Sequence, residues 1–401
     1  MRMKFNKSGQ LLLVSAASLL VAGLVTACGT LTVDFVFVAS SKAAGTNSYG
    51  EIDVIEVNSQ SGRMRQIPTS PFPSGGRNPV AEAVSSNNTN LYVVNHDDNS
   101  IVQFVIGSDG KLYPQNTINT PGIFPVAVAV NGSNLFVVDT YQPLPACSNA
   151  APCSGSVAVL PIDSTGKLGA PVANNSLGYW PLSLPSSPKD ILLPTGVNVL
   201  TSGSAVYAYV SAYDTTANTG YVFGFAVGSG GVLSPLNGGQ PFLAGTNPSS
   251  VTSDGTGSYV YATDFAQGKI WAYAVASGSG LLTPLSGSPF ASGDEPMAMV
   301  VDSAGKYAYV ANSLDSNVTA YSVSSGTLSY LGTFATGTEP VAIGIDPSTK
   351  HFLYTANFLG GTVSGFELST TDGSLLNTQF SPYTSNAQPT AVAAIPHGST
   401  K

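Results

Sequence analysis

The sequence predicts an all-β protein, a seven-bladed propeller built from four-stranded antiparallel blades. Glycine and proline are abundant, with 43 and 27 among 401 residues. That number is too high for a helical protein and is typical of short strands joined by turns. A unit of about 50 residues also recurs along the chain, which is the size of one propeller blade. Finally, the two ends of the chain each hold part of one further unit.

Composition excludes several classes of protein before any motif is considered. Hydrophobic residues make up 43% of the chain, so a sizeable core is available and general disorder is excluded. Charged residues make up only 9%, against roughly 25% in average domains. The net charge is −8, and no basic stripe can be drawn. Binding to nucleic acid through its phosphates is therefore not expected.

The first element is an export signal over residues 1–27. Arg2, Lys4 and Lys7 precede an uncharged apolar run over residues 11–26, which is too short for a comfortable membrane span. The run ends in Val-Thr-Ala-Cys, which resembles the lipobox of bacterial lipoproteins. The resemblance implies a lipid on Cys28, and Gly29 after it implies the outer membrane. The alternative is an ordinary cleaved signal. Residues 28–34 would form a short tether, and residues 35–401 the propeller.

Each blade opens with a polar or aromatic residue, a proline and an alternating apolar strand. The seven openings predict blades that begin near residues 79, 125, 188, 248, 296, 340 and 389. A second, aromatic strand follows and ends in Asn or Asp, as in 259–264 and 307–312. A third strand comes next, as in 270–273, and a Gly-x-Leu turn then leads into the fourth. These turns begin at Gly110, Gly166, Gly326 and Gly373.

The two ends of the chain predict how the ring closes. The last opening, over residues 389–395, has no second, third or fourth strand after it. Residues 35–69 supply those three strands without a first. One C-terminal strand plus three N-terminal strands therefore make the seventh blade, which removes the free sheet edges.

The repeats resemble the lactonase-like propellers with YVTN-type repeats. Tyr309-Val310-Ala311-Asn312, Tyr354-Thr355-Ala356-Asn357 and the Gly-Thr-Glu-Pro over residues 337–340 carry the resemblance, which covers essentially residues 35–401. Members of this family include 6-phosphogluconolactonases, lactonising enzymes and exported propellers without an assigned reaction. The motif therefore specifies the fold strongly and the activity weakly.

A lactonase needs a base to activate water and a group to stabilise the oxyanion. The predicted catalytic residues are His96, with Asp98 or Asp139, as the base and Arg77 as the electrophilic partner. The alternative is that residues 95–100 form an ordinary solvated turn. The sequence also departs from the family, because none of the seven openings holds a histidine. Basic residues that could bind a phosphorylated sugar are scattered, at Arg77, Lys189 and Lys269.

Two further groups of side chains could bind a metal or form a cross-link. Carboxylates in the predicted second-to-third-strand loops could bind Ca²⁺ if they converge on the axis, namely Asp98, Asp139, Asp214, Asp264 and Asp315. Ordinary turn chemistry is the alternative. Cys147 and Cys153 predict a disulfide in an oxidising compartment, with free thiols or a metal as the alternatives.

The second blade carries the longest insertions, over residues 141–154 and 174–187. Tyr141, Trp180 and Lys189 in and beside them are candidate ligand-binding residues, because long loops on a rigid scaffold often carry specificity. Packing of Trp180 over its own blade is the alternative. The preferred interpretation is a lipid-anchored, monomeric propeller at the cell envelope that binds a ligand or partner and requires no cofactor. The alternative is a lactonase.

Overall fold

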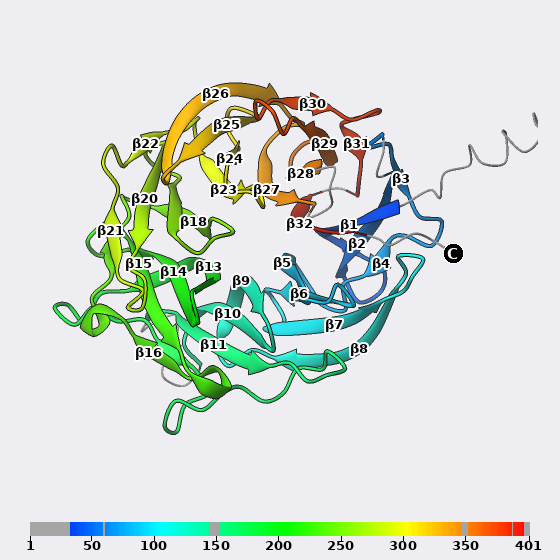
Figure 1. The fold of residues 1–401 in the computed structure, drawn as a ribbon. Coiled ribbons are helices and arrows are strands. Elements are labelled where there is room, and N and C mark those ends of the chain that lie inside the picture. Colours follow the sequence, from blue (N-terminus) through cyan, green and yellow to red (C-terminus); the bar gives the residue numbers. More distant parts are fainter. Residues whose placement is uncertain are drawn as a thin grey trace, which may run out of the picture.

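In a computed structural model the chain forms seven antiparallel sheets around one axis, as the sequence predicts (Figure 1). The structure describes residues 33–58, 61–143, 147, 153–346, 352–386 and 388–396. Only two short 3₁₀ turns interrupt the strands in this part of the chain, η1 (Ser229–Gly231) and η2 (Asn237–Gly239). No helix of the described residues is long and apolar enough to cross a membrane. Cys28 and the segment before it lie outside the described residues.

The closing blade, blade 7, combines both ends of the chain as predicted. Its inner strand is β32 (Pro389–Ile395), which pairs with β1 (Val33–Ala44) in a register that sets Phe35 opposite Ile395. The sheet continues outward through β2 (Tyr49–Asn58) and β3 (Met64–Gln66), and β4 (Phe72–Pro73) also pairs with β2.

The other six blades follow in chain order, each running from the channel outward (Figure 1). Blades 1 and 2 comprise β5 (Pro79–Val84), β6 (Asn90–Asn95), β7 (Ser100–Ile106) and β8 (Leu112–Asn119), then β9 (Ile123–Asn131), β10 (Asn134–Tyr141), β11 (Ser156–Pro161) and β12 (Trp180–Pro181). Blades 3 and 4 comprise β13 (Leu192–Ser202), β14 (Ala205–Asp214), β15 (Thr219–Val227), β16 (Leu233–Pro235) and β17 (Phe242–Leu243), then β18 (Pro248–Ser253), β19 (Tyr259–Asp264), β20 (Lys269–Val275), β21 (Leu282–Pro284) and β22 (Phe290–Ala291). Blades 5 and 6 comprise β23 (Pro296–Val301), β24 (Tyr307–Asn312), β25 (Asn317–Ser324) and β26 (Thr327–Ala335), then β27 (Pro340–Ile345), β28 (Phe352–Asn357), β29 (Thr362–Leu368), β30 (Leu375–Asn377) and β31 (Tyr383–Thr384).

The core lies between neighbouring blades rather than at one centre. Both faces of each second strand are covered, so every residue of β6 and of β28 is buried. A strand covered on both faces reads as a near-continuous apolar run. This burial explains why the second strands are the most regular part of the repeat.

One glycine in each blade packs directly against the preceding blade. These glycines lie in the turn between the third and fourth strands and have φ between 64° and 87°: Gly62, Gly110, Gly166, Gly231, Gly280, Gly326 and Gly373. A Cβ on Gly326 would lie 2.3 Å from the Tyr259 ring of the preceding blade, and one on Gly110 would lie 2.5 Å from Phe35. Only glycine satisfies both the left-handed backbone and this close approach.

Buried tyrosines reinforce the same contacts with hydrogen bonds. The hydroxyls of Tyr92, Tyr209, Tyr261 and Tyr309 donate to the carbonyl oxygens of Gly166, Gly280, Gly326 and Gly373, at 2.7 to 3.1 Å. Burial raises the pKa of Tyr92 to about 12, so this donor keeps its proton over the whole neutral range.

Blade 3 begins later than the sequence prediction near residue 188. Its inner strand starts at Leu192, and Pro194 rather than Pro188 takes the place of the opening proline. Pro194 stands opposite Ala212 beside a register shift, as Pro248 stands opposite Asp264 in blade 4. Pro188 and Pro194 both precede apolar residues in the sequence, and the strand pairing shows that Pro194 is the opening proline of blade 3.

Replacing one interblade glycine tests the contact between blades. We expect Gly326→Ala to destabilise the fold by about 1 to 3 kcal/mol more than Gly278→Ala, because the added methyl overpacks against Tyr259. Gly278 has a similar φ of 83°, but no atom lies within 4 Å of the place that a methyl group would take there. It therefore isolates the backbone cost, about 1 kcal/mol. Urea unfolding of the two variants measures the difference, and equal losses would contradict the packing role.

Candidate functional site

The loops between blades and the turns between second and third strands share one face, which we call the mouth face. Within blade 1, the backbone N–H of Arg77 donates to Asp98 Oδ2 at 2.7 Å. The same connection recurs in blade 5, where the N–H of Asp294 donates to Asp315 Oδ2 at 2.9 Å. Most of the candidate residues predicted from the sequence belong to these loops and turns.

A central cavity of about 600 Å³ reaches this face. All seven inner strands line it, mostly through the first half of each strand, together with Glu339 and Phe358 from the mouth-face loops. Its lining combines apolar and polar surface. Four hydroxyl-bearing residues belong to it, and the hydroxyl of each forms a hydrogen bond within the fold: Thr195, Ser249, Ser250 and Thr390. Two glutamates, Glu82 and Glu339, belong to the lining residues, although the carboxylate oxygens of Glu82 are shielded from solvent, and none of the described lining residues is Arg, Lys or His.

Glu82 lies on β5 and is the only charged residue among the seven inner strands. Both of its carboxylate oxygens are shielded from solvent. Burial raises the pKa of Glu82 to about 8, although the nearby backbone N–H of Ala393 on β32 acts in the opposite direction. Glu82 is therefore mostly protonated at pH 7.

The residues before the opening prolines form the rim of the channel. Five of them have a left-handed backbone, with φ between 53° and 63°: Asn78, Phe124, Glu295, Glu339 and Gln388. The carbonyl of Glu339 accepts the N–H of Phe358 at 2.8 Å, and the carbonyl of Asn78 accepts the N–H of His96 at 2.9 Å. A left-handed backbone costs most for a bulky residue such as Phe124. Strained rim residues of this kind are typical of functional sites.

His96 and Phe124 form an aromatic stack on the rim between blades 1 and 2. Their ring centroids lie 4.7 Å apart with planes 9° from parallel, and Tyr141 meets Phe124 edge-on at 6.4 Å. His96 Nδ1 lies 2.6 Å from Asp97 Oδ1, and the histidine side chain is 27% exposed. Partial burial alone would raise the pKa of Asp97, but hydrogen bonds from His96 and Asn78 outweigh it, so the pKa is lowered. An ionised carboxylate thus orients the imidazole, which is the arrangement a general base needs.

The partner of His96 is therefore Asp97, and not Asp98 or Asp139 as predicted. Asp98 instead binds Arg77, whose Nε and Nη2 lie 2.7 and 2.6 Å from Asp98 Oδ1. This hydrogen bond and the charge of Asp98 raise the pKa of Arg77, which is half exposed. The pair joins the loop that enters blade 1 to the turn of the same blade, so the guanidinium is already engaged by a carboxylate.

Asp139 lies in the next blade and faces its own loop. Its Oδ2 accepts the N–H of Gly122 at 3.1 Å. Burial raises the pKa of Asp139 to about 7, outweighing the hydrogen bonds from Thr120 and Gly122. Among the described residues, no hydrogen bond or ion pair joins Asp139 to His96.

The predicted ring of carboxylates does not converge. Among the described residues, no three His, Cys, Asp or Glu side chains lie close enough to hold a metal ion. The carboxylates bind backbone N–H groups of their own loops instead. Asp214 accepts from Thr216 and Ala217, and Asp264 accepts from Thr246, Asn247 and Ala266. This turn chemistry is the alternative that the sequence left open.

The remaining predicted residues divide between core and surface. Trp180 is only 5% exposed and packs with the core between blades 2 and 3, so the prediction of an exposed ligand-binding aromatic was wrong. Tyr141 stays on the rim beside Phe124, and Lys189 is exposed in the loop before β13. Cys147 and Cys153 form the predicted disulfide, with Cα atoms 5.4 Å apart.

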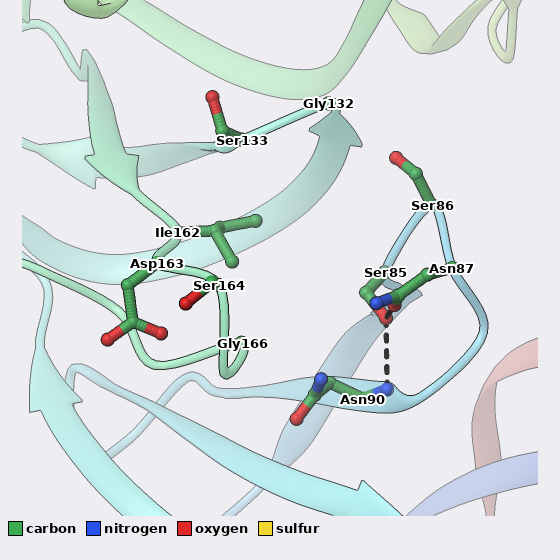
Figure 2. Close-up of a pocket in the computed structure, with 10 residues that line it drawn as sticks. All are labelled: Ser85, Ser86, Asn87, Asn90, Gly132, Ser133, Ile162, Asp163, Ser164 and Gly166. Atoms are coloured by element: carbon green, nitrogen blue, oxygen red, sulfur yellow. Dashed lines mark hydrogen bonds between the residues drawn. The ribbon is translucent and has the colours of Figure 1, made fainter.

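A second pocket of about 370 Å³ lies on the opposite face, between the turns of blades 1 and 2 (Figure 2). Serine and asparagine side chains are among its lining residues, but these groups form hydrogen bonds within their own turns. Ser85 Oγ accepts the N–H of Asn90 at 2.9 Å, as Asp302 accepts the N–H of Tyr307 at the same turn of blade 5. None of the candidate site residues predicted from the sequence lines this pocket.

Two residues of the mouth face and its cavity were not predicted from the sequence, Glu82 and Phe124, and Asp97 was not chosen as the partner of His96. A signal existed for Glu82, because it is the only charged residue in the seven inner strands. No local pattern distinguishes Asp97 from Asp98, since both lie in one short turn. Phe124 is conspicuous only by comparison with the polar residues that precede the other opening prolines.

Comparison with known proteins agrees with this fold. Residues 41–177 and 276–397, together more than half of the chain, match the family described as lactonase, seven-bladed β-propeller. The chain therefore belongs to the lactonase family of seven-bladed β-propellers. Blade 3, whose inner strand β13 is the longest of the seven inner strands, lies outside the matched residues. No curated protein matches the chain.

Solved structures share the fold at low sequence identity. A candidate 6-phosphogluconolactonase from Bacteroides fragilis is 19% identical with a TM-score of 0.67, covering 90% of this chain and 98% of its own. One from Bacteroides uniformis is 17% identical with a TM-score of 0.70, covering 90% and 99%. The periplasmic gluconolactonase of Pseudomonas aeruginosa is 19% identical with a TM-score of 0.66, covering 91% and 100%.

The buried carboxyl group of Glu82 predicts that stability falls as pH rises through the neutral range. Glu82 titrates near 4.5 when unfolded and near 8 when folded, so the unfolded chain loses its proton first. Its contribution is complete below pH 4.5 and is lost by about 1.4 kcal/mol per pH unit toward pH 8. Urea unfolding at pH 5 and pH 8 measures this slope. We expect Glu82→Gln to reduce this slope, of which Asp139 contributes a part in the same direction, and Glu367→Gln on the third strand β29 to leave it unchanged. An unaltered slope in Glu82→Gln would contradict the assignment.

Proposed function

We propose that this propeller binds a small uncharged ligand in its central cavity, as a binding scaffold at the cell envelope. The observation that carries the proposal is the cavity lining, which combines apolar side chains with polar surface and has no basic side chain among the described lining residues. Such a surface suits a ligand that is partly apolar and bears hydroxyl or carbonyl oxygens. The proposal needs no cofactor, and a closed ring needs no partner to cover a sheet edge, so we expect a monomer.

The same lining disfavours a phosphorylated ligand. Phosphate recognition uses clustered Arg or Lys, and the described lining residues include neither. The arginine beside the rim, Arg77, is paired with Asp98. The 6-phosphogluconolactone substrate that the names of two structural neighbours imply therefore fits this cavity less well than a neutral sugar lactone, the substrate class that the name gluconolactonase implies.

Lactone hydrolysis is the second candidate function, and family membership together with the His96–Asp97 pair supports it. In this reaction His96 would take a proton from water as the water oxygen bonds to the lactone carbonyl carbon. The ring C–O bond then breaks, and the proton passes to the leaving alkoxide. Arg77 is held by Asp98, so stabilisation of the oxyanion would fall to other donors on the rim.

One experiment separates the two functions. With residues 29–401, we expect calorimetry to detect binding of D-glucono-1,5-lactam, a stable neutral lactone analogue, and to show at least tenfold weaker binding of 6-phosphogluconate. Titration of acid release from sugar and aliphatic lactones then measures turnover in the wild type and in His96→Ala. Turnover that is lost in His96→Ala would establish a hydrolase. Preference for the phosphorylated compound would contradict the proposed ligand class.

We also propose that a lipid on Cys28 anchors the chain to the outer membrane. Strand β1 ends toward the mouth face, where it leads to the turn before β2, so Val33 at its start lies on the opposite face. Only four residues separate Cys28 from Val33, a span of at most roughly 18 Å. A tether this short would hold the opposite face near the membrane and direct the cavity away from it.

Replacing the acylated cysteine tests the anchor. In a bacterial host we expect the wild type to fractionate with membranes and Cys28→Ser to be released, because stable attachment requires the acyl chains. Immunoblots of membrane and soluble fractions measure the distribution. Cys147→Ser, which removes only the disulfide, serves as the control, and a membrane-bound Cys28→Ser would contradict lipid anchoring.

A further inference from the structure

Blade 6 is the only blade whose mouth-face loops contribute to the described lining of the central cavity. Glu339 precedes β27 and Phe358 follows β28, whereas the other described lining residues all lie on inner strands. The N–H of Phe358 donates to the carbonyl oxygen of Glu339 at 2.8 Å, which holds the two residues beside each other at the mouth. We call Glu339 and Phe358 the blade 6 rim pair.

The carboxylate of Glu339 is not engaged within the described part of the ring. The backbone N–H of Glu339 donates to Ser316 Oγ at 3.4 Å, but no hydrogen bond or ion pair from a described residue reaches the carboxylate. The side chain is partly exposed, and its oxygens are not sealed from solvent as those of Glu82 are. Glu295 takes the same place in blade 5, but its Oε2 accepts Ser313 Oγ at 3.0 Å and it does not line the cavity.

Phe358 supplies the aromatic surface of the cavity. It is the only aromatic residue among the described lining residues, and it is partly exposed. Phe265 takes the same place in blade 4, where its N–H donates to the carbonyl oxygen of Asn247 at 2.9 Å, but it lies outside the lining. One aromatic face can cover one side of a ring-shaped ligand, whereas recognition of quaternary ammonium groups typically uses a cage of several aromatic rings.

We propose that the blade 6 rim pair recognises a neutral ring that carries adjacent hydroxyl groups. Phe358 covers the apolar face of the ring, and the two carboxylate oxygens of Glu339 accept hydrogen bonds from two of its hydroxyls. This inference rests on the proposed function and names the residues that select its ligand. A carboxylate accepts hydrogen bonds and repels anions, so the pair favours sugar-like rings over aliphatic lactones, which lack hydroxyl donors, and over phosphorylated sugars.

The test is calorimetric titration of residues 29–401 with D-glucono-1,5-lactam and with 2-piperidone, which has the same lactam ring without hydroxyl groups. The wild type should bind the hydroxylated ring at least about tenfold more tightly, because only that ring can donate to the carboxylate. Glu339→Gln keeps one acceptor oxygen and should bind D-glucono-1,5-lactam about tenfold more weakly, as expected for one lost hydrogen bond to a charged group. Phe358→Leu should also weaken binding of this ligand, and Phe358→Tyr, which keeps the aromatic ring, should bind it like the wild type.

Matched controls and a cationic probe keep the outcomes distinct. Glu295→Gln and Phe265→Leu change the equivalent residues of blades 5 and 4 and should bind like the wild type, and thermal melts verify that each variant is folded. The inference alone is overturned if Glu339→Gln or Phe358→Leu binds D-glucono-1,5-lactam like the wild type, or if 2-piperidone binds the wild type as tightly. It is also overturned if tetramethylammonium binds more tightly than the lactam and loses that affinity in Glu339→Gln, since the pair would then hold a cation. Failure of every neutral probe in the wild type would refute the proposed function and, with it, this inference.

Discussion

The ring depends on the contact between one glycine in each blade and the blade before it. The left-handed glycine brings the turn between third and fourth strands onto an aromatic ring or a buried side chain, at a distance that no Cβ permits. Four tyrosine hydroxyls then bind the carbonyl oxygens of those glycines. The same contact recurs between every pair of neighbouring blades. It therefore fixes the angle between each blade and the next, and seven blades placed in this way close the ring.

The cavity follows from that regular packing. Seven inner strands around one axis leave a channel whose wall is made by small and branched residues, with the opening prolines and their left-handed neighbours at its rim. Polar side chains on the mouth face form hydrogen bonds within the turns and loops, as Asp214, Asp264 and the Arg77–Asp98 pair do. The His96–Asp97 pair, which stacks on Phe124, and the buried carboxyl group of Glu82 do not follow this pattern. The His96–Asp97 pair supports the hydrolytic alternative.

Much of the fold could be predicted because the repeat is written seven times. The alternating strands, the Gly-x-Leu turns and the incomplete first and last units together specify the number of blades and the way the ring closes. Pro188 failed as a blade start because a proline before an apolar run does not reveal strand register, which pairing of Pro194 with Ala212 decides. Trp180 failed because its loop folds back onto the core between blades 2 and 3.

The site was less predictable than the fold, for a physical reason. Partners on the rim come from different blades, as Phe124 and His96 do, so their stacking depends on interblade geometry that no single repeat encodes. The side chains of neighbouring residues in a tight turn point in different directions. Asp97 therefore hydrogen-bonds to His96, while Asp98 hydrogen-bonds to Arg77. Predicting Glu82 as a site residue would have required knowing that the inner strands border a cavity as well as a core.

The pairing of β1 with β32 has a consequence for biosynthesis. Phe35 is among the first residues of the propeller to be made and Ile395 among the last, yet they are partners in one sheet. Until translation ends, β1 has no inner neighbour, and the ring stays open with two exposed strand edges that could pair with other chains. Premature termination anywhere before Pro389 would therefore leave an incomplete ring that cannot close, and such fragments should be aggregation-prone substrates for cellular proteolysis rather than smaller working propellers.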